Sequence, residues 1–530
     1  PGPARLPSVK GGTMKVNLYY APYPSQIFEG ETDPVNTERP FNPRSALPTL
    51  AAGLRAFCAS NGLSCEIEIV DLQLGSQRVP YKSIPYGPRI MNCYRYGVPF
   101  EEAAEKIREA DVHGITCNFT NSAQIVADLA RFIKQVKPGT TVVVGGVDCT
   151  ARPEYYLRRG VDVVVLGEGE HVFGRVVEAV ANRRGLDDIP NICTADRPTA
   201  TRIDMSALVN LDELEPMALD LVGDLSLFDD TAEGPPPAGV HGNFICWETS
   251  RGCAWRCSFC SAPSRGHYRY MSAEAMDRHL KYFRSLGVRT IVWQEDNPLS
   301  RIQRKGTGDY LYERGREELL QMFDLIRGHG FAWEFANGIE FGKFMQDGRF
   351  DHELAAALLD STVTDEGWVG CYRVQIPLDN MNIKKKRFPK LLGVDEQVDI
   401  LATMLTDHGV GHQTYDLFIG YPEHDPEGID LFGDYCLRIK SELSALGGST
   451  YQPYFNVFNL ALLPGATDYT SLRSLLAFDI EEHPELVGIF LSAVETDHFS
   501  YWDIYQKRLH MTNLLNDREL HRRYDGIYAG

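Results

Sequence analysis

The sequence lacks any apolar run of the roughly 20 residues that a membrane-spanning helix needs. Residues 1–12 also lack the basic and then apolar pattern of a signal peptide. Basic charge is scarce, since 53 Lys and Arg stand against 72 Asp and Glu, for a formal net charge of −19. A surface this acidic repels phosphate backbones. We therefore expect a cytoplasmic protein with no membrane and no nucleic-acid partner.

Cysteine is also sparse, with 12 in 530 residues, and its irregular spacing argues against a disulfide framework. Three cysteines nevertheless stand close together, with C-x3-C-x2-C spacing: Cys253, Cys257 and Cys260. Three such thiolates can bind three irons of a 4Fe-4S cluster and leave the fourth iron open. The alternatives are three unrelated thiols or a zinc site that lacks a ligand, although zinc motifs usually pair C-x2-C with a second pair.

The first third of the chain alternates apolar strand-like runs with amphipathic helical segments. This pattern predicts an α/β fold that begins with a doubly wound, Rossmann-like domain around a buried parallel sheet. A ligand of such a sheet binds at the carboxyl ends of the strands. The candidate ligand-binding residues at those ends are Asn118, Thr120, Asn121, Gly145, Gly146, Asp148, Gly167, Glu168, Gly169 and Glu170.

The second half predicts six strand–helix units, and hence a partial (βα)6 barrel with its functional loops at the strands' carboxyl ends. The cysteine loop follows the first of these strands. We expect a flexible tail over 1–13, a ligand-binding domain over 14–195, a linker over 196–242, the barrel over 243–470 and a small helical cap over 471–530.

Two strings of the first domain, Val-Val-Gly-Gly146-Val-Asp-Cys-Thr and Val-Leu-Gly-Glu-Gly-Glu170, together with the cysteine loop, resemble the cobalamin-dependent radical S-adenosylmethionine (SAM) methyltransferases. The resemblance implies that the glycine loops bind cobalamin and that the three cysteines bind a 4Fe-4S cluster. It further implies that Glu295 and Asp296, after the second barrel strand, and Gly420, in Ile-Gly-Tyr-Pro-Glu423, contact SAM. A helix N-cap is the alternative role for the acidic pair.

The chain departs from the family pattern around the cobalt. Asp148 stands where the family often has histidine. The D-x-H-x-x-G motif, which brings a histidine to cobalt in other cobalamin proteins, is absent: Asp111-Val-His113 begins like it, but Thr116 occupies the glycine position. We therefore expect that no protein histidine binds the cobalt.

The resemblance is greatest to the branch of this family that methylates C2 of tryptophan in thiopeptide antibiotic biosynthesis. By that resemblance Glu274 is the candidate ligand of the open iron, and its alternative role is a first-turn glutamate that interacts with the helix dipole. Tyr310 is the candidate contact for an indole N–H. A small-molecule substrate and an external electron donor are implied. The alternative function is another C- or P-methylation, or a ring rearrangement, that uses a 5′-deoxyadenosyl radical.

Overall fold

The structure is a computed structural model that describes residues 12–36, 44–199, 203–228, 236–261, 267–302, 309–378 and 392–516. The chain forms two compact units. The first comprises Pro1–Asp224, Leu463–Ser471 and Phe478–Gly488, and the second comprises Leu225–Leu462, Leu472–Ala477 and Ile489–Gly530. Each unit is described by itself below.

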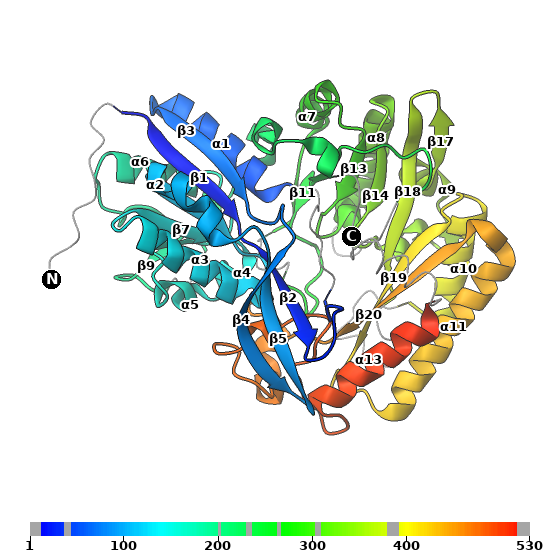
Figure 1. The fold of residues 1–530 in the computed structure, drawn as a ribbon. Coiled ribbons are helices and arrows are strands. Elements are labelled where there is room, and N and C mark those ends of the chain that lie inside the picture. Colours follow the sequence, from blue (N-terminus) through cyan, green and yellow to red (C-terminus); the bar gives the residue numbers. More distant parts are fainter. Residues whose placement is uncertain are drawn as a thin grey trace. The chain divides into compact units, whose positions relative to one another are not determined.

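The first unit is built on a six-stranded sheet with the order β3-β1-β6-β7-β8-β9, in which only the edge strand β9 is antiparallel (Figure 1). Its strands are β1 (Met14–Tyr20), β3 (Cys65–Asp71), β6 (Val112–Thr116), β7 (Thr141–Gly145), β8 (Val163–Val165) and β9 (Ile192–Thr194). The predicted doubly wound fold is confirmed. It forms because both faces of these strands are apolar, so each face must be covered by helices.

Two separate cores lie on the two faces of this sheet. One core joins Val16 and Leu18 of β1 to helices α1 (Ala46–Asn61) and α6 (Val172–Ala181). The other joins Tyr19 to helices α2 (Ala104–Glu109), α3 (Ala123–Val136) and α5 (Pro153–Leu157). Successive residues of β1 therefore point to opposite cores, as the pleat of a strand requires.

A three-stranded antiparallel sheet was not predicted. It has the order β2-β5-β4 and consists of β2 (Tyr23–Phe28), β4 (Gln77–Tyr86) and β5 (Arg89–Gly97). Residues 478–488 pack on it: the Gln26 amide donates to the Glu485 carbonyl oxygen at 2.9 Å, and Phe478 stacks on Tyr86. The predicted helical cap over 471–530 is thus divided between the two units.

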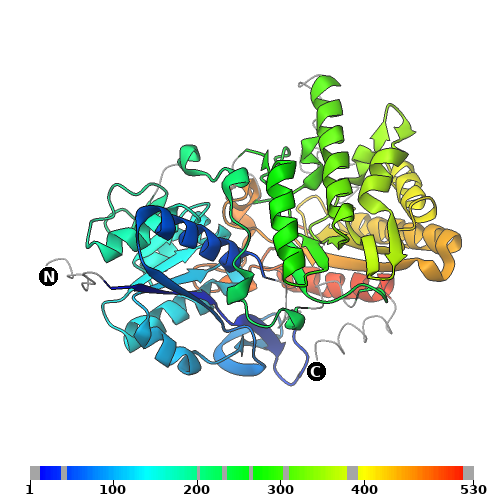
Figure 2. The ribbon, with the colours of Figure 1, turned by 90° about the horizontal axis from the view of Figure 1, so that it is seen from above.

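The second unit carries six parallel strands in chain order, as expected for the predicted partial barrel. They are β10 (Phe244–Trp247), β13 (Thr290–Trp293), β14 (Ala332–Phe335), β18 (Gly367–Pro377), β19 (His412–Ile419) and β20 (Gln452–Asn459). An additional strand, β17 (Ser361–Thr364), pairs antiparallel with β18. The helices that alternate with the strands cover one face of the sheet (Figures 1 and 2). They are α7 (Ala273–Ser285), α8 (Asp309–Gly328), α9 (His352–Leu359), α10 (Val394–Thr406) and α11 (Pro426–Gly447).

The C-terminal part of the second unit contains one long helix, α13 (Tyr501–Leu515), which packs on β20. The Asn516 amide donates to the Phe455 carbonyl oxygen at 2.9 Å and ties the end of this helix to the sheet. In the described parts of the chain, no helix has the length and apolar character needed to cross a membrane.

His113 is the second residue of β6, at the end of the sheet away from the strands' carboxyl ends. It is fully buried, and its Nδ1 lies 3.0 Å from the Tyr19 hydroxyl. The ring therefore belongs to the core of the sheet, on the side away from the glycine loops. Burial, aided by the charges of Lys137 and Lys134, lowers the pKa of His113 to about 3.

This buried histidine predicts an acid-sensitive fold. In the unfolded chain the ring takes up a proton near pH 6.5, whereas in the folded chain it does so only near pH 3. The unfolded state therefore binds more protons between these values. The contribution of His113 therefore leaves the free energy of unfolding highest above pH 6.5. As the pH is lowered below this value, the free energy of unfolding falls by up to about 1.4 kcal/mol per pH unit.

Urea denaturation at several pH values would measure this effect. His113→Gln removes the titrating group, so the free energy of unfolding should decline less steeply below pH 6.5 than in the wild type. The exposed His510 of α13 provides the matched control, and His510→Gln should retain the wild-type slope. Parallel slopes for wild type and His113→Gln would contradict the prediction.

Candidate active site

The glycine loop after β7 lies directly against the end of β6. Gly146 has φ +117°, and a Cβ at this position would lie 2.3 Å from the Cys117 carbonyl oxygen and 2.7 Å from Asn118 Oδ1. Such distances exclude any side chain. Asn118 Oδ1 also accepts a hydrogen bond from the Val147 N–H at 3.3 Å. The absence of side chains at Gly145 and Gly146 thus leaves bare backbone at the carboxyl edge of the sheet.

Thr150 joins this loop to the second glycine loop. Its hydroxyl donates to the Gly146 carbonyl oxygen at 2.9 Å and accepts from the Gly167 N–H at 2.9 Å. One hydroxyl therefore fixes the spacing between the loops after β7 and β8. A lone threonine carries no distinctive sequence pattern, so this role of Thr150 was not predicted.

The two glutamates of the second loop are engaged within the protein. Glu168 accepts a hydrogen bond from the Val209 N–H at 2.8 Å. Glu170 is buried against α1, where a Cβ at Gly53 would lie 2.9 Å from the Glu170 Cβ. Gly169 packs beside the same helix, near Leu50. These contacts hold the loop in position, and the ligand contact expected for the two glutamates stays a prediction.

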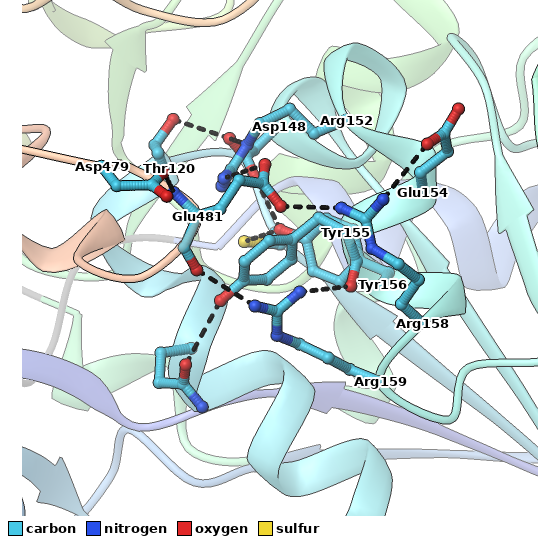
Figure 3. A network of polar contacts seen from close by, with 12 residues as sticks. Thr120, Asp148, Arg152, Glu154, Tyr155, Tyr156, Arg158, Arg159, Asp479 and Glu481 are labelled. Carbon is cyan, nitrogen blue, oxygen red and sulfur yellow. Dashed lines mark hydrogen bonds and ion pairs between the residues drawn. The ribbon is translucent and has the colours of Figure 1, made fainter.

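Asp148 is the centre of a buried polar network (Figure 3). Its carboxylate accepts hydrogen bonds from the Thr120 hydroxyl at 2.6 Å and from the Tyr156 hydroxyl at 2.5 Å. The Arg152 guanidinium binds both carboxylate oxygens, at 3.1 and 2.8 Å. Thr120 and Asp148, both predicted to face the ligand, are thus bonded to each other, and we propose that they anchor the loop.

The same network reaches the segment Phe478–Gly488. Glu481 lies 3.6 Å from Arg152 and 2.9 Å from Arg158, and its carbonyl oxygen accepts a hydrogen bond from Arg159 (Figure 3).

The exposed Asn118 and the half-buried Asn121 remain as polar side chains at the carboxyl edge of the sheet. With bare backbone between them, this edge fits a large flat ligand that carries amide groups.

The three cysteines of the second unit lie on the loop after β10, and each is half-buried and outside any disulfide. The short ladder of β11 (Ser250–Arg251) with β12 (Arg269–Tyr270) lies at the base of this loop. Among the described residues, no three His, Cys, Asp or Glu side chains converge on the position of a single metal ion. Three thiolates of a 4Fe-4S cluster bind three different irons and need not converge on one point. The donor set therefore fits the cluster.

Two successive residues after β13, Glu295 and Asp296, accept hydrogen bonds from the chain that leads into the cysteine loop. Glu295 accepts hydrogen bonds from the Thr249 N–H and hydroxyl and from the Ser250 hydroxyl, all at 2.5 Å. Asp296 accepts from the Gly252 N–H at 2.8 Å. Burial raises the pKa of Glu295, and the hydrogen bonds from Ser250 and Thr249 act in the opposite direction.

Two more residues continue this support. The Ser300 hydroxyl accepts from the Ala254 N–H at 3.2 Å, and Glu340 accepts from the Trp255 indole N–H at 2.9 Å. Glu340 also accepts from the Asn297 amide at 2.7 Å. The acidic pair expected to contact SAM thus holds the backbone that leads into the cysteine loop.

Models of two protein families match this chain. The B12-binding domain matches residues 91–177, and the radical SAM superfamily matches residues 247–432. The uncharacterized methyltransferase PH0819 of Pyrococcus horikoshii is 32% identical over 73% of this chain and 79% of its own length. The chain belongs to the cobalamin-dependent radical SAM methyltransferases.

Other members of these methyltransferases match a smaller part of the chain. TokK of Streptomyces tokunonensis is 31% identical over 31% of this chain and 23% of its own length. The fold resembles the solved structure of TsrM from Kitasatospora setae with tryptophan and a SAM analogue. That structure matches with a TM-score of 0.54 and 14% identity, over 88% of this chain and 77% of TsrM. Because the B12-binding and radical SAM models both match the chain, the cofactors of this methyltransferase are cobalamin, a 4Fe-4S cluster and SAM.

The remaining predicted site residues of this methyltransferase lie apart from the networks described above. Gly420 has φ +91° at the end of β19, and its N–H donates to the buried His424 Nδ1 at 3.1 Å. Glu274 is exposed in the first turn of α7, behind the Ser272 N-cap. Tyr310 belongs to the first turn of α8, but its side chain lies outside the described residues.

Proposed function

We propose that this methyltransferase transfers the methyl group of SAM, through cobalamin, to C2 of L-tryptophan in the biosynthesis of a natural product such as a thiopeptide. The choice of tryptophan as substrate is supported by the likeness of fold to TsrM, whose solved structure contains tryptophan. Cobalamin supplies a centre that accepts a methyl group and passes it to carbon. The net transfer is redox-neutral, so an external electron donor would serve only to bring cobalamin to the reduced state that accepts a methyl group.

The residues of the chain have separable tasks in this proposal. The loops at Gly145–Gly146 and Gly167 hold cobalamin against bare backbone, and Thr150 sets the distance between them. Cys253, Cys257 and Cys260 hold the cluster on a loop kept in place by the carboxylates of Glu295 and Asp296. The backbone at Gly420 is the proposed contact for the adenine of SAM.

A second candidate is a methylation that uses a 5′-deoxyadenosyl radical at an unactivated carbon. The relatives favour it, because one of them is named a hopanoid C-3 methylase, of Methylococcus capsulatus, and is 30% identical over 36% of this chain. An anaerobic assay with reconstituted protein, SAM, cobalamin and L-tryptophan distinguishes the two. Mass spectrometry should find tryptophan heavier by one CH2 group and S-adenosylhomocysteine without 5′-deoxyadenosine. Stoichiometric 5′-deoxyadenosine, or unmodified tryptophan, would contradict the proposal.

Glu274→Ala tests the proposed ligand of the open iron. If the Glu274 carboxylate binds this iron, the variant should lose turnover by roughly tenfold or more, and the electron paramagnetic resonance spectrum of its cluster should change on addition of SAM. The wild-type spectrum should not respond to SAM. The exposed Glu317 of α8 offers the matched control, and Glu317→Ala should behave like wild type. If the spectra of Glu274→Ala equal those of the wild type, Glu274 serves only the start of α7.

A further inference from the structure

A row of polar side chains crosses three neighbouring strands of the barrel. The Gln375 amide, on β18, donates to Asp416 Oδ2 at 2.6 Å, and the Asn456 amide, on β20, donates to Asp416 Oδ1 at 3.1 Å. Asp416 and Asn456 are directly paired in the β19–β20 register. The two amides therefore fix the orientation of the carboxylate between them.

This row lies on the face of the sheet away from the helices. Tyr415, Leu417 and Ile419 of β19 are fully buried, and Tyr415 bonds to Tyr451 on the helix-covered side. Because side chains alternate along a strand, Asp416 and Phe418 point to the opposite, inner face. Both are only half-buried, as is Asn456, so solvent and a ligand can reach this face.

One hydrogen-bond acceptor on this inner face, the Gln375 amide oxygen, has no partner among the described residues. Since the Gln375 NH2 group is directed at Asp416, its Oε1 points elsewhere, and this atom is buried without a hydrogen-bond partner among the described residues. Gln375 is only 8% exposed, so water satisfies this oxygen poorly. Two basic groups lie nearby in the described part of the chain: Arg373 is paired with Glu334 at 3.2 Å, and burial lowers the pKa of His412 to about 4.

An aromatic surface continues from the row toward the carboxyl ends of the strands. Phe418 and Phe458 each stand two residues beyond a member of the row, and their ring centroids are 5.5 Å apart. Phe259, between the second and third cysteines of the cluster loop, lies 5.7 Å from Phe418. The row of polar side chains, the pair Phe418 and Phe458, and the cluster loop therefore follow one another along the same face of the sheet.

We infer that Gln375, Asp416 and Asn456 bind the ammonium group of the substrate, whose flat apolar body packs on Phe418 and Phe458. An ammonium group has three donors and one positive charge, which matches a carboxylate flanked by an amide oxygen. The inference rests on the proposed function and deepens it, because it assigns the substrate to the aromatic primary amines. SAM also carries an ammonium group, and the test must separate the two sources.

Binding to the reconstituted full-length protein tests the inference without turnover. Isothermal titration would compare tryptamine, which has the ammonium group, with indole-3-propionate, which lacks it, and with SAM. Asp416→Asn should weaken tryptamine binding at least about tenfold and leave indole-3-propionate and SAM unchanged. The exposed Asp434 of α11 provides the matched control, since Asp434→Asn changes the same charge away from the row.

A second variant guards against a loss that comes only from misfolding. Asn456→Lys places a tethered ammonium group beside Asp416, so it should exclude tryptamine while iron content and SAM affinity stay at wild-type values. Equal tryptamine affinity in wild type and Asp416→Asn would overturn the inference, as would a loss confined to SAM. Tryptophan that binds through its ammonium group without being methylated would overturn the proposed function alone.

Discussion

Replacement of Cys253, Cys257 or Cys260 by Ala, one at a time, is expected to remove the iron–sulfur cluster and abolish methyl transfer. In the proposed site each thiolate binds a different iron, so the loss of one would leave two ligands for a four-iron cluster. Mutation of groups that merely support metal ligands costs roughly 10–100-fold in affinity or activity, and the loss of a ligand should exceed this. Iron and sulfide per chain, together with turnover, measure the effect.

Cobalamin binding provides the internal control for these variants. The glycine loops belong to the first unit and the cysteine loop to the second, so each variant should still bind cobalamin as wild type does. Cys65→Ala is the matched substitution, because Cys65 is also half-buried but lies on β3. If a triad variant retained iron and full activity, the assignment of the cluster to this loop would be wrong.

The parts of the fold that could be predicted are those in which burial alone decides the structure. Continuous β-branched runs such as 141–144 predict strands buried on both faces, and the structure has β7 there. The antiparallel strands β4 and β5 escaped prediction because their exposed and buried residues alternate weakly and β4 contains Pro80 and Pro85. Through Lys82 and Tyr86, β4 also contacts a segment distant in sequence, Phe478–Gly488, and no local pattern reveals this contact.

The candidate site likewise has features that a local motif predicts and features that depend on the three-dimensional arrangement of the strands. The cysteine triad is a local motif, so its spacing alone is enough to predict the cluster ligands. The roles of Glu295 and Asp148 depend on which loop faces which, and this follows from the strand order and register. Glu295 bonds to the Thr249–Ser250 backbone and hydroxyls because β10 and β13 are neighbours, and Asp148 meets Thr120 because β6 and β7 are neighbours. A sequence pattern shows that such carboxylates stand at strand ends, but not whether they face a ligand or the next loop.

Gly146→Ala is expected to abolish cobalamin binding and leave the cluster intact. A Cβ at this position would overlap the Cys117 carbonyl oxygen, 2.3 Å away, so the β7 loop would have to move away from the end of β6. The φ of +117° adds strain for any side chain, on the order of 1–3 kcal/mol. The loop would then no longer present its backbone beside Gly167, to which Thr150 ties it.

Gly139→Ala separates the two causes of this loss. Gly139 has φ +82°, so alanine there carries comparable backbone strain, but its Cβ would meet no atom within 4 Å. It also precedes β7, at the opposite end of the sheet from the glycine loops. Both variants should therefore lose stability, measured by urea denaturation, while only Gly146→Ala should lose the cobalamin absorbance that remains with the protein after gel filtration. If Gly146→Ala retained cobalamin, the close approach of the two loops would not be needed for the cofactor. If Gly139→Ala lost cobalamin as well, general destabilisation would explain both results.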